Sequence, residues 1–81
     1  MTREHLAGTV ARMAGVSRED AHAATDLTAL GLGSLDILRV VNECRMCGLP
    51  VTYQELAAKP TLDAWWTRIS HLLRTNPYLA A

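Results

Sequence analysis

The sequence predicts an all-α protein, a small bundle of three longer helices and one short helix. First, apolar residues recur at helical three- and four-residue spacing in three separate stretches. Second, a residue type that commonly caps helix N-termini opens each expected helix, and glycine or proline follows its end. Third, no segment alternates like a strand, because the only β-like fragment, Val51–Tyr53, lies next to a proline.

The first two of the longer helices are bounded by clear stop signals. One is expected over residues 2–14, with Thr2 as its N-cap and Gly15 at its end. Its apolar face consists of Leu6, Val10, Met13 and Ala14. The other is expected over residues 34–47, because Gly48 suits the position just after a helix. Its core face consists of Ile37, Val41 and Cys44.

The C-terminal half contains the short helix and the last long one. The residues TYQE, 52–55, form a capping box, which opens a short helix over residues 52–59. The last helix is expected over residues 61–74, with Thr61 as its N-cap. Its wide apolar stripe consists of Leu62, Trp65, Trp66, Ile69, Leu72 and Leu73.

Residues 15–33 are expected to form a long connection, with a short turn around Ser17–Ala24. Ser17 is followed three residues later by Asp20, which is typical of a local cap. A connection of this length in a compact domain is usually functional or held by core contacts. The residues expected to make these contacts are Leu27, Leu30 and Leu32.

Length and charge limit the possible partners. The chain has 81 residues, and its eight Lys and Arg balance its eight Asp and Glu. It therefore lacks the basic surface with which proteins bind nucleic acids or anionic membranes. The polar start Thr2–Glu4 is not followed by a signal-peptide core, and no apolar run reaches the roughly 18 residues of a membrane span. Cys44 and Cys47 are too few for a disulfide framework. We expect a soluble, cytoplasmic monomer with free thiols.

The most informative stretch is LGLGSLDILRVV, residues 30–41. Gly31 and Gly33 allow backbone angles that other residues resist, which leaves Ser34 uncrowded. Ser34 begins a helix, where free N–H groups and the positive end of the dipole favour an anion. A phosphate esterified to Ser34 would therefore lie where the helix can hold it. The alternative is that Ser34 is an ordinary N-cap.

Together with LPVTYQELAAKPTLDAWW, this stretch resembles the phosphopantetheine-binding carrier proteins, most closely the aryl carrier proteins of siderophore-type nonribosomal peptide synthesis. The likeness runs from about Asp26 to Ile69. It implies that Ser34, between Gly33 and Leu35, bears a 4′-phosphopantetheine arm, which a separate phosphopantetheinyl transferase supplies from coenzyme A. The arm would carry an aryl or aminoacyl thioester from an adenylation enzyme to condensation or tailoring enzymes. The resemblance further implies one carrier domain over residues 1–81 that catalyses nothing itself.

One position departs from the family pattern. The carrier proteins usually have an aspartate directly before the serine, whose carboxylate is expected to help the transferase, and here that residue is Gly33. The departure predicts slower modification or dependence on a particular transferase. Asp36 supplies a charge in the first turn, but we do not assume that it is equivalent.

The resemblance places partner recognition on the second helix and the short helix. The expected docking patch consists of Leu35, Leu38, Tyr53 and Ala57, with Arg39 and Arg45 setting orientation. The alternative is that Leu38 and Tyr53 pack inward. Fatty-acid carriers have an acidic second helix, whereas Asp36 and Glu43 are offset here by the two arginines, which favours apolar, short-range recognition.

Other motifs give weaker indications. The residues CRMC, 44–47, close a helix instead of opening one after a strand, so we expect Cys44 in the core and Cys47 near the surface. The three histidines, His5, His22 and His71, show no metal-ligand spacing, so we assign no metal and no catalytic residue. Two alternative functions stay open, a polyketide-type acyl carrier and a small helical interaction module in which Ser34 is only a cap.

Overall fold

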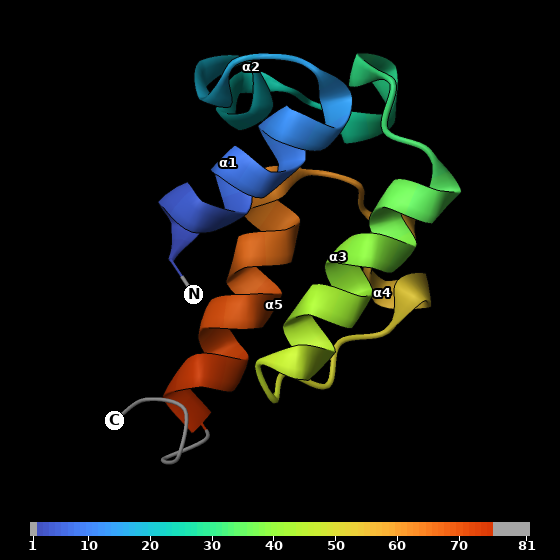
Figure 1. Cartoon of the computed structure of the whole chain (residues 1–81). Coiled ribbons are helices and arrows are strands. Elements are labelled where there is room, and N and C mark those ends of the chain that lie inside the picture. Colours follow the sequence, from blue (N-terminus) through green and yellow to red (C-terminus); the bar gives the residue numbers. More distant parts are fainter. Residues whose placement is uncertain (1, 76–81) are drawn as a thin grey trace.

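The computed structural model describes residues 2–75, which contain five α-helices and one 3₁₀ helix (Figure 1). The elements are α1 (Arg3–Ala14), α2 (Arg18–Ala23), η1 (Leu27–Leu30), α3 (Ser34–Met46), α4 (Tyr53–Ala58) and α5 (Leu62–Thr75). The predicted all-α fold class is confirmed, and the four expected helices lie within one residue of the expected bounds at each end. The described residues contain no strand.

The connection over residues 15–33 is more structured than expected, because it holds both α2 and η1. The expected local cap is present, since the Ser17 hydroxyl accepts a hydrogen bond from the Asp20 N–H at 3.1 Å. A complete helix was not expected here because α2 buries only Ala21 and so has no apolar stripe. The expected core contacts are confirmed: Leu27 and Leu32 are buried, and Leu30 packs half-buried against the core.

Local capping sets most helix ends. The Thr2 hydroxyl accepts from the His5 N–H at 3.1 Å, and Gly15 ends α1 in the left-handed region with φ of 71°. Thr52 and Glu55 form the expected capping box of α4. The Thr61 hydroxyl accepts from the Ala64 N–H at 3.1 Å at the start of α5. These ends could be located from sequence because each depends on one or two nearby residues.

The helices pack in two groups around one core. In Figure 1, α1 and α2 lie at the top left above α5, and α3 and α4 lie at the right. The helix α1 packs against α2 and α5, and α3 packs against α4. The largest fully buried side chains come from α1, η1, α3, α4, α5 and the loop between α3 and α4: Trp65, Leu6, Leu27, Leu49, Leu56, Leu62, Ile69, Val10, Val40, Val51 and Cys44. This core fixes the start of α3 relative to α4.

Candidate functional site

Ser34 is the first residue of α3, and its side chain is exposed. The N-cap of this helix is Gly33, which has no side chain to accept the N–H groups of the first turn. The alternative that Ser34 serves as the N-cap is therefore wrong. Within residues 2–75, the structure shows no hydrogen bond from the Ser34 hydroxyl, so this oxygen is free for chemistry.

Asp36 performs the capping that Ser34 does not. One oxygen of its carboxylate, Oδ2, accepts a hydrogen bond from the Gly33 N–H at 3.0 Å. The other, Oδ1, lies 3.8 Å from Nη1 of Arg39. This arrangement is the second half of a capping box, and it fixes the backbone on both sides of Ser34. The contribution of Asp36 was not predicted, because the usual capping box has Ser or Thr at the N-cap and Glu or Gln at the third helical residue, whereas this helix has Gly33 and Asp36.

The two glycines before Ser34 have different roles. Gly31 has φ of 99°, in the left-handed region that side chains resist, and it ends η1. Gly33 has φ of −98° and ψ of 178°, an extended conformation that any residue adopts. The expectation that both glycines supply unusual backbone angles is therefore correct for Gly31 and wrong for Gly33. A Cβ at position 33 would meet only Oδ2 of Asp36, at 3.9 Å.

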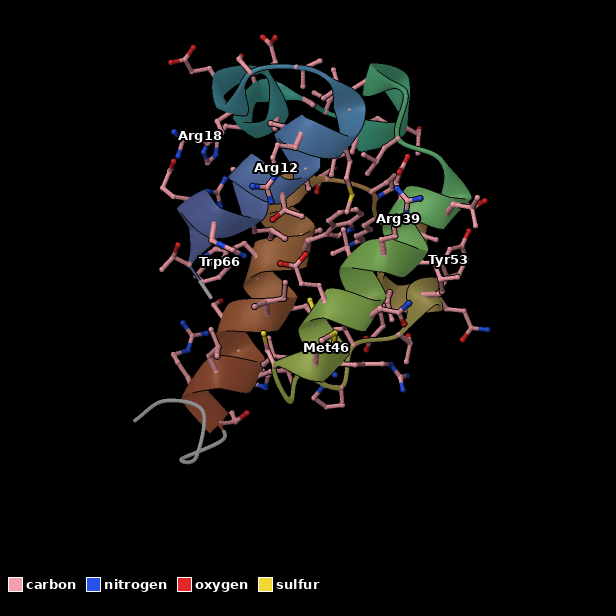
Figure 2. All side chains as sticks on the ribbon, viewed as in Figure 1. Arg12, Arg18, Arg39, Met46, Tyr53 and Trp66 are labelled. Carbon is pink, nitrogen blue, oxygen red and sulfur yellow. The ribbon has the colours of Figure 1, made fainter. Side chains whose placement is uncertain are left out.

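Apolar side chains surround Ser34 on the surface of α3 and α4. Leu35 is 69% exposed, Leu38 is 44% exposed and Tyr53 is 37% exposed, so the alternative that Leu38 and Tyr53 pack inward is not what the structure shows. Ala57 is half-buried and packs against the core. Figure 2 places Tyr53 on the same side of the molecule as Arg39.

The two arginines near this surface differ. Arg39 is exposed and lies beside Asp36. The Arg45 side chain is directed to the loop after α3, where its Nε–H donates to the Val51 carbonyl at 3.3 Å. Arg39 is thus available to a partner at the start of α3, and Arg45 stabilises the path of the chain towards α4.

The profile of the family described as phosphopantetheine attachment site matches residues 4–69. The chain belongs to this family. Phenyloxazoline synthase MbtB of Mycobacterium tuberculosis (strain ATCC 25618 / H37Rv) is 33% identical over 67 residues, 83% of this chain and 5% of that protein. The ferrichrome siderophore peptide synthetase of Mycosarcoma maydis is 32% identical over 59 residues, 73% of this chain and 1% of that protein.

A shorter protein matches over more of the chain. Isochorismatase of Bacillus subtilis (strain 168) is 33% identical over 82 residues, 96% of this chain and 26% of that protein. The chain therefore spans only a small part of these relatives. No solved structure gives a significant match.

The geometry around Ser34 fits the 4′-phosphopantetheine that this family attaches. The hydroxyl is exposed and not used in capping, so a transferase can reach it. The first turn of a helix carries N–H groups without intrahelical partners, and Gly33 has no side chain that fills them. A phosphate bonded to Ser34 would therefore have N–H donors and the positive end of the α3 dipole beside it.

The other candidate groups do not form a second reactive site. Cys44 is buried and Cys47 is exposed, both as free thiols, as expected. Burial raises the pKa of the Cys44 thiol to about 11, which makes it unreactive at neutral pH. His5 pairs with Glu43 and His22 with Glu4. Residues 2–75 contain no cluster of acidic, histidine and cysteine side chains suited to a metal ion.

The structure also places one exposed apolar residue that the sequence reasoning missed. Met46, at the end of α3, is 89% exposed. It follows Leu35 by eleven residues and Leu38 by eight, which is helical spacing, so the pattern could have been extended to it. None of the described helices is long and apolar enough to cross a membrane.

Proposed function

We propose that this chain is a carrier that bears 4′-phosphopantetheine on Ser34 and itself catalyses no reaction. The observation that carries the proposal is the exposed Ser34 hydroxyl at the first residue of α3, with no capping role, in a member of the phosphopantetheine attachment-site family. In the attachment reaction, Ser34 Oγ forms a bond to the phosphorus nearer the pantetheine in coenzyme A. Its proton passes to a base of the transferase, and adenosine 3′,5′-bisphosphate leaves.

The proposed pathway class is nonribosomal peptide synthesis, with an aryl or aminoacyl group as cargo. Two observations support it: the names of the relatives, which include a phenyloxazoline synthase and a siderophore peptide synthetase, and the PTLDAWW segment at the start of α5. The proposed partners are a phosphopantetheinyl transferase, an adenylation enzyme, and condensation or tailoring enzymes. We propose a cytoplasmic protein, because free thiols such as Cys44 and Cys47 persist in that compartment.

Mass spectrometry of the intact protein tests attachment. The chain is incubated with coenzyme A and a transferase of broad specificity, and its mass should rise by one phosphopantetheinyl group. The Ser34→Ala variant should gain nothing, and it should keep the thermal stability of the parent because the Ser34 hydroxyl makes no structural hydrogen bond. An unchanged mass of the parent chain, or modification of Ser34→Ala, would contradict the proposal.

We further propose that Leu35, Leu38, Tyr53 and Ala57 form the docking patch for the loading enzyme, with Arg39 at its edge. Leu38→Asp or Tyr53→Asp places a carboxylate in this apolar surface and should lower the rate of loading at least tenfold, because partner contact must then desolvate a charge. Loading is measured with an aryl-acid-adenylating enzyme of a siderophore synthetase, acting on the phosphopantetheinylated chain.

The matched control is Thr67→Asp, an exposed position in the middle of α5. It adds the same charge on a different helix and should load at the parent rate. Both docking variants should retain the helical circular dichroism spectrum of the parent, because both positions are exposed. Normal loading of Leu38→Asp would show that the patch is wrongly assigned.

A further inference from the structure

A basic hollow lies on the last helix, on a part of the surface that the proposed carrier function does not use. It is here called the α5 hollow. Its volume is about 500 Å³, and it is lined by the last residue of the α4 segment and one side of α5: Lys59, Ala64, Thr67, Arg68, His71 and Arg74. Three of these residues are Lys or Arg, one is His, and none is acidic.

The spacing of the basic residues along α5 explains why they line one hollow. Arg68, His71 and Arg74 follow one another at intervals of three residues. This spacing keeps them within about 120° of each other around the helix, and each rises about 4.5 Å beyond the last. The core takes another side of the same helix, where Trp65 and Ile69 are buried. The basic side is therefore left to solvent.

The positive charge of the α5 hollow is not balanced within residues 2–75. Three arginines elsewhere pair with carboxylates: Arg3 with Asp63, Arg18 with Glu4, and Arg39 with Asp36. In the hollow, Arg68 has such a partner, because its Nε lies 3.2 Å from Oε1 of Glu55. Lys59 and Arg74 are exposed and form no ion pair in the described range. One edge of the hollow thus already holds a carboxylate, and the rest of its charge is free.

We infer that the α5 hollow binds an acidic segment of a partner protein other than the loading enzyme. Guanidinium groups form charge-assisted hydrogen bonds with carboxylates, and clusters of basic residues recur as sites for acidic peptides. An extended segment presents every second side chain on one side, about 7 Å apart. Arg68 and Arg74 lie about 9 Å apart along the helix axis, a difference that their long side chains can span.

The distribution of charge favours a short acidic segment over a nucleic acid or an anionic membrane. Only three Lys and Arg line the hollow, and the whole chain has no net charge. A long polyanion or a lipid surface is attracted by a broad basic surface, which this chain lacks. A concave hollow of this volume admits a narrow peptide and excludes a flat bilayer.

The position of the hollow leaves the proposed attachment site free. In Figure 1, the end of α5 lies at the lower left and the start of α3 at the upper right. A partner held along α5 therefore does not cover Ser34. The inference goes beyond the proposed carrier function, and it does not depend on attachment of the arm.

Fluorescence polarisation tests the inference on the full, unmodified chain. The probe is a fluorescein-labelled peptide of alternating Glu and Ala, and its counterpart has Gln in place of Glu. The Glu peptide should bind, less tightly as salt is raised because the charges are exposed, and the Gln peptide should not bind. Lys59→Gln/Arg74→Gln removes two exposed charges from the hollow and should weaken binding at least about fivefold.

The matched control is Arg12→Gln/Arg18→Gln, which removes two exposed charges on α1 and α2 and should bind like the parent. Thr67→Asp adds a carboxylate within the hollow and should weaken peptide binding by a similar factor while loading normally, because loading is proposed to use the patch on α3 and α4. Leu38→Asp should show the reverse.

Three results would overturn the inference: no binding of the Glu peptide, equal weakening by the two double variants, or tighter binding of phosphatidylserine vesicles or single-stranded DNA than of the peptide. The second would assign binding to net charge alone, and the third would assign the hollow to another class of partner. Each would leave the intact-mass result for Ser34, and so the proposed carrier function, unaffected.

Discussion

At the start of α3, different residues stabilise the helix end and present a free hydroxyl. In many helices a single serine does both. Asp36 accepts the Gly33 N–H at 3.0 Å and stabilises the start of α3, while the Ser34 hydroxyl remains exposed. A serine that capped the helix would lose part of that role on esterification. Here the exposed hydroxyl and the stabilising carboxylate belong to different residues, so the proposed modification need not weaken the helix.

Gly33 marks the departure from the family pattern, and it can be tested directly. Gly33→Asp should fold, because the backbone at position 33 is extended and a Cβ meets only Oδ2 of Asp36, at 3.9 Å. An aspartate is also a good N-cap, so stability should change by only a few tenths of a kcal/mol. The rate of phosphopantetheinylation should rise severalfold if a carboxylate at this position assists the transferase. Intact mass over time measures that rate.

Gly33→Asn is the matched control, because it has the same size and capping ability without the charge. It should be modified at the rate of the parent chain. Equal acceleration of both variants would assign the effect to the backbone instead of to the carboxylate. A slower Gly33→Asp variant would show that Asp36 already supplies the charge that this site tolerates.

At the scale of elements, α4 is held in place by α5. The Trp65 Nε1–H of α5 donates a buried hydrogen bond to the Leu56 carbonyl of α4 at 2.8 Å. Leu56 is the one buried residue of this six-residue helix, and the Thr52–Glu55 capping box secures its start. A helix this short is marginal alone, so the position of Tyr53 in the proposed docking patch depends on these contacts.

Trp65→Phe removes the hydrogen bond and leaves the Leu56 carbonyl buried without a partner. The free energy of unfolding should fall by about 2–3 kcal/mol, from the unsatisfied acceptor and the smaller ring together. Urea unfolding followed by far-ultraviolet circular dichroism measures the loss. Trp66→Phe, at the half-buried neighbour, is the control and should cost less than about 1 kcal/mol. Equal losses in the two variants would show that the Trp65 hydrogen bond is not what matters.

The elements also show what the sequence could and could not predict. The four helices with a cap or a stop signal were placed within a residue, because those signals are local. The helix α2 was expected only as a turn, since Ala21 is its single buried residue and no periodic pattern announces it. The exposure of Leu38 and Tyr53 does not follow from the sequence, because helical spacing alone does not say which of two apolar faces meets the core. The role of Asp36 is not predictable from the usual capping box, because Gly33 provides no capping side chain.

At the scale of the whole molecule, one backbone hydrogen bond joins the segment before α3 to the loop between α4 and α5. The Leu27 N–H donates to the Pro60 carbonyl at 2.6 Å, and the Leu27 side chain is fully buried. This contact fixes the segment that leads into Gly31 and Ser34. The position of Ser34 is thus determined by residues from both halves of the chain.

One buried core thiol, Cys44, contributes to the response of stability to alkaline pH. Burial raises the pKa of Cys44 from the ordinary 9.0 to about 11, so the folded protein keeps the proton that the unfolded chain releases first. The unfolded state therefore binds fewer protons between these values, and the free energy of unfolding should fall as pH rises from about 9 to about 11. The slope from this one group approaches about 1.4 kcal/mol per pH unit.

Urea unfolding across this pH range tests the effect by comparing variants. Cys44→Ala should be less stable at every pH, because it leaves a cavity, but it should lose this part of the pH dependence. Cys47→Ser, at the exposed thiol, should keep most of the slope, because burial is the larger cause of the raised pKa of Cys44 and the charge of Cys47 is a smaller one. An unchanged slope in Cys44→Ala would assign the alkaline loss to other groups.

The free Ser34 hydroxyl at the start of α3 has a consequence for the stability of the modified protein. Within the described residues, the Ser34 hydroxyl makes no hydrogen bond that stabilises the fold. The unmodified chain, the chain with the arm and the chain with a loaded arm should therefore have the same fold and nearly the same melting temperature. In the proposed carrier cycle, repeated loading and unloading of Ser34 would therefore not destabilise the fold. An enzyme that distinguishes these forms must recognise the appended group itself, not a rearranged scaffold.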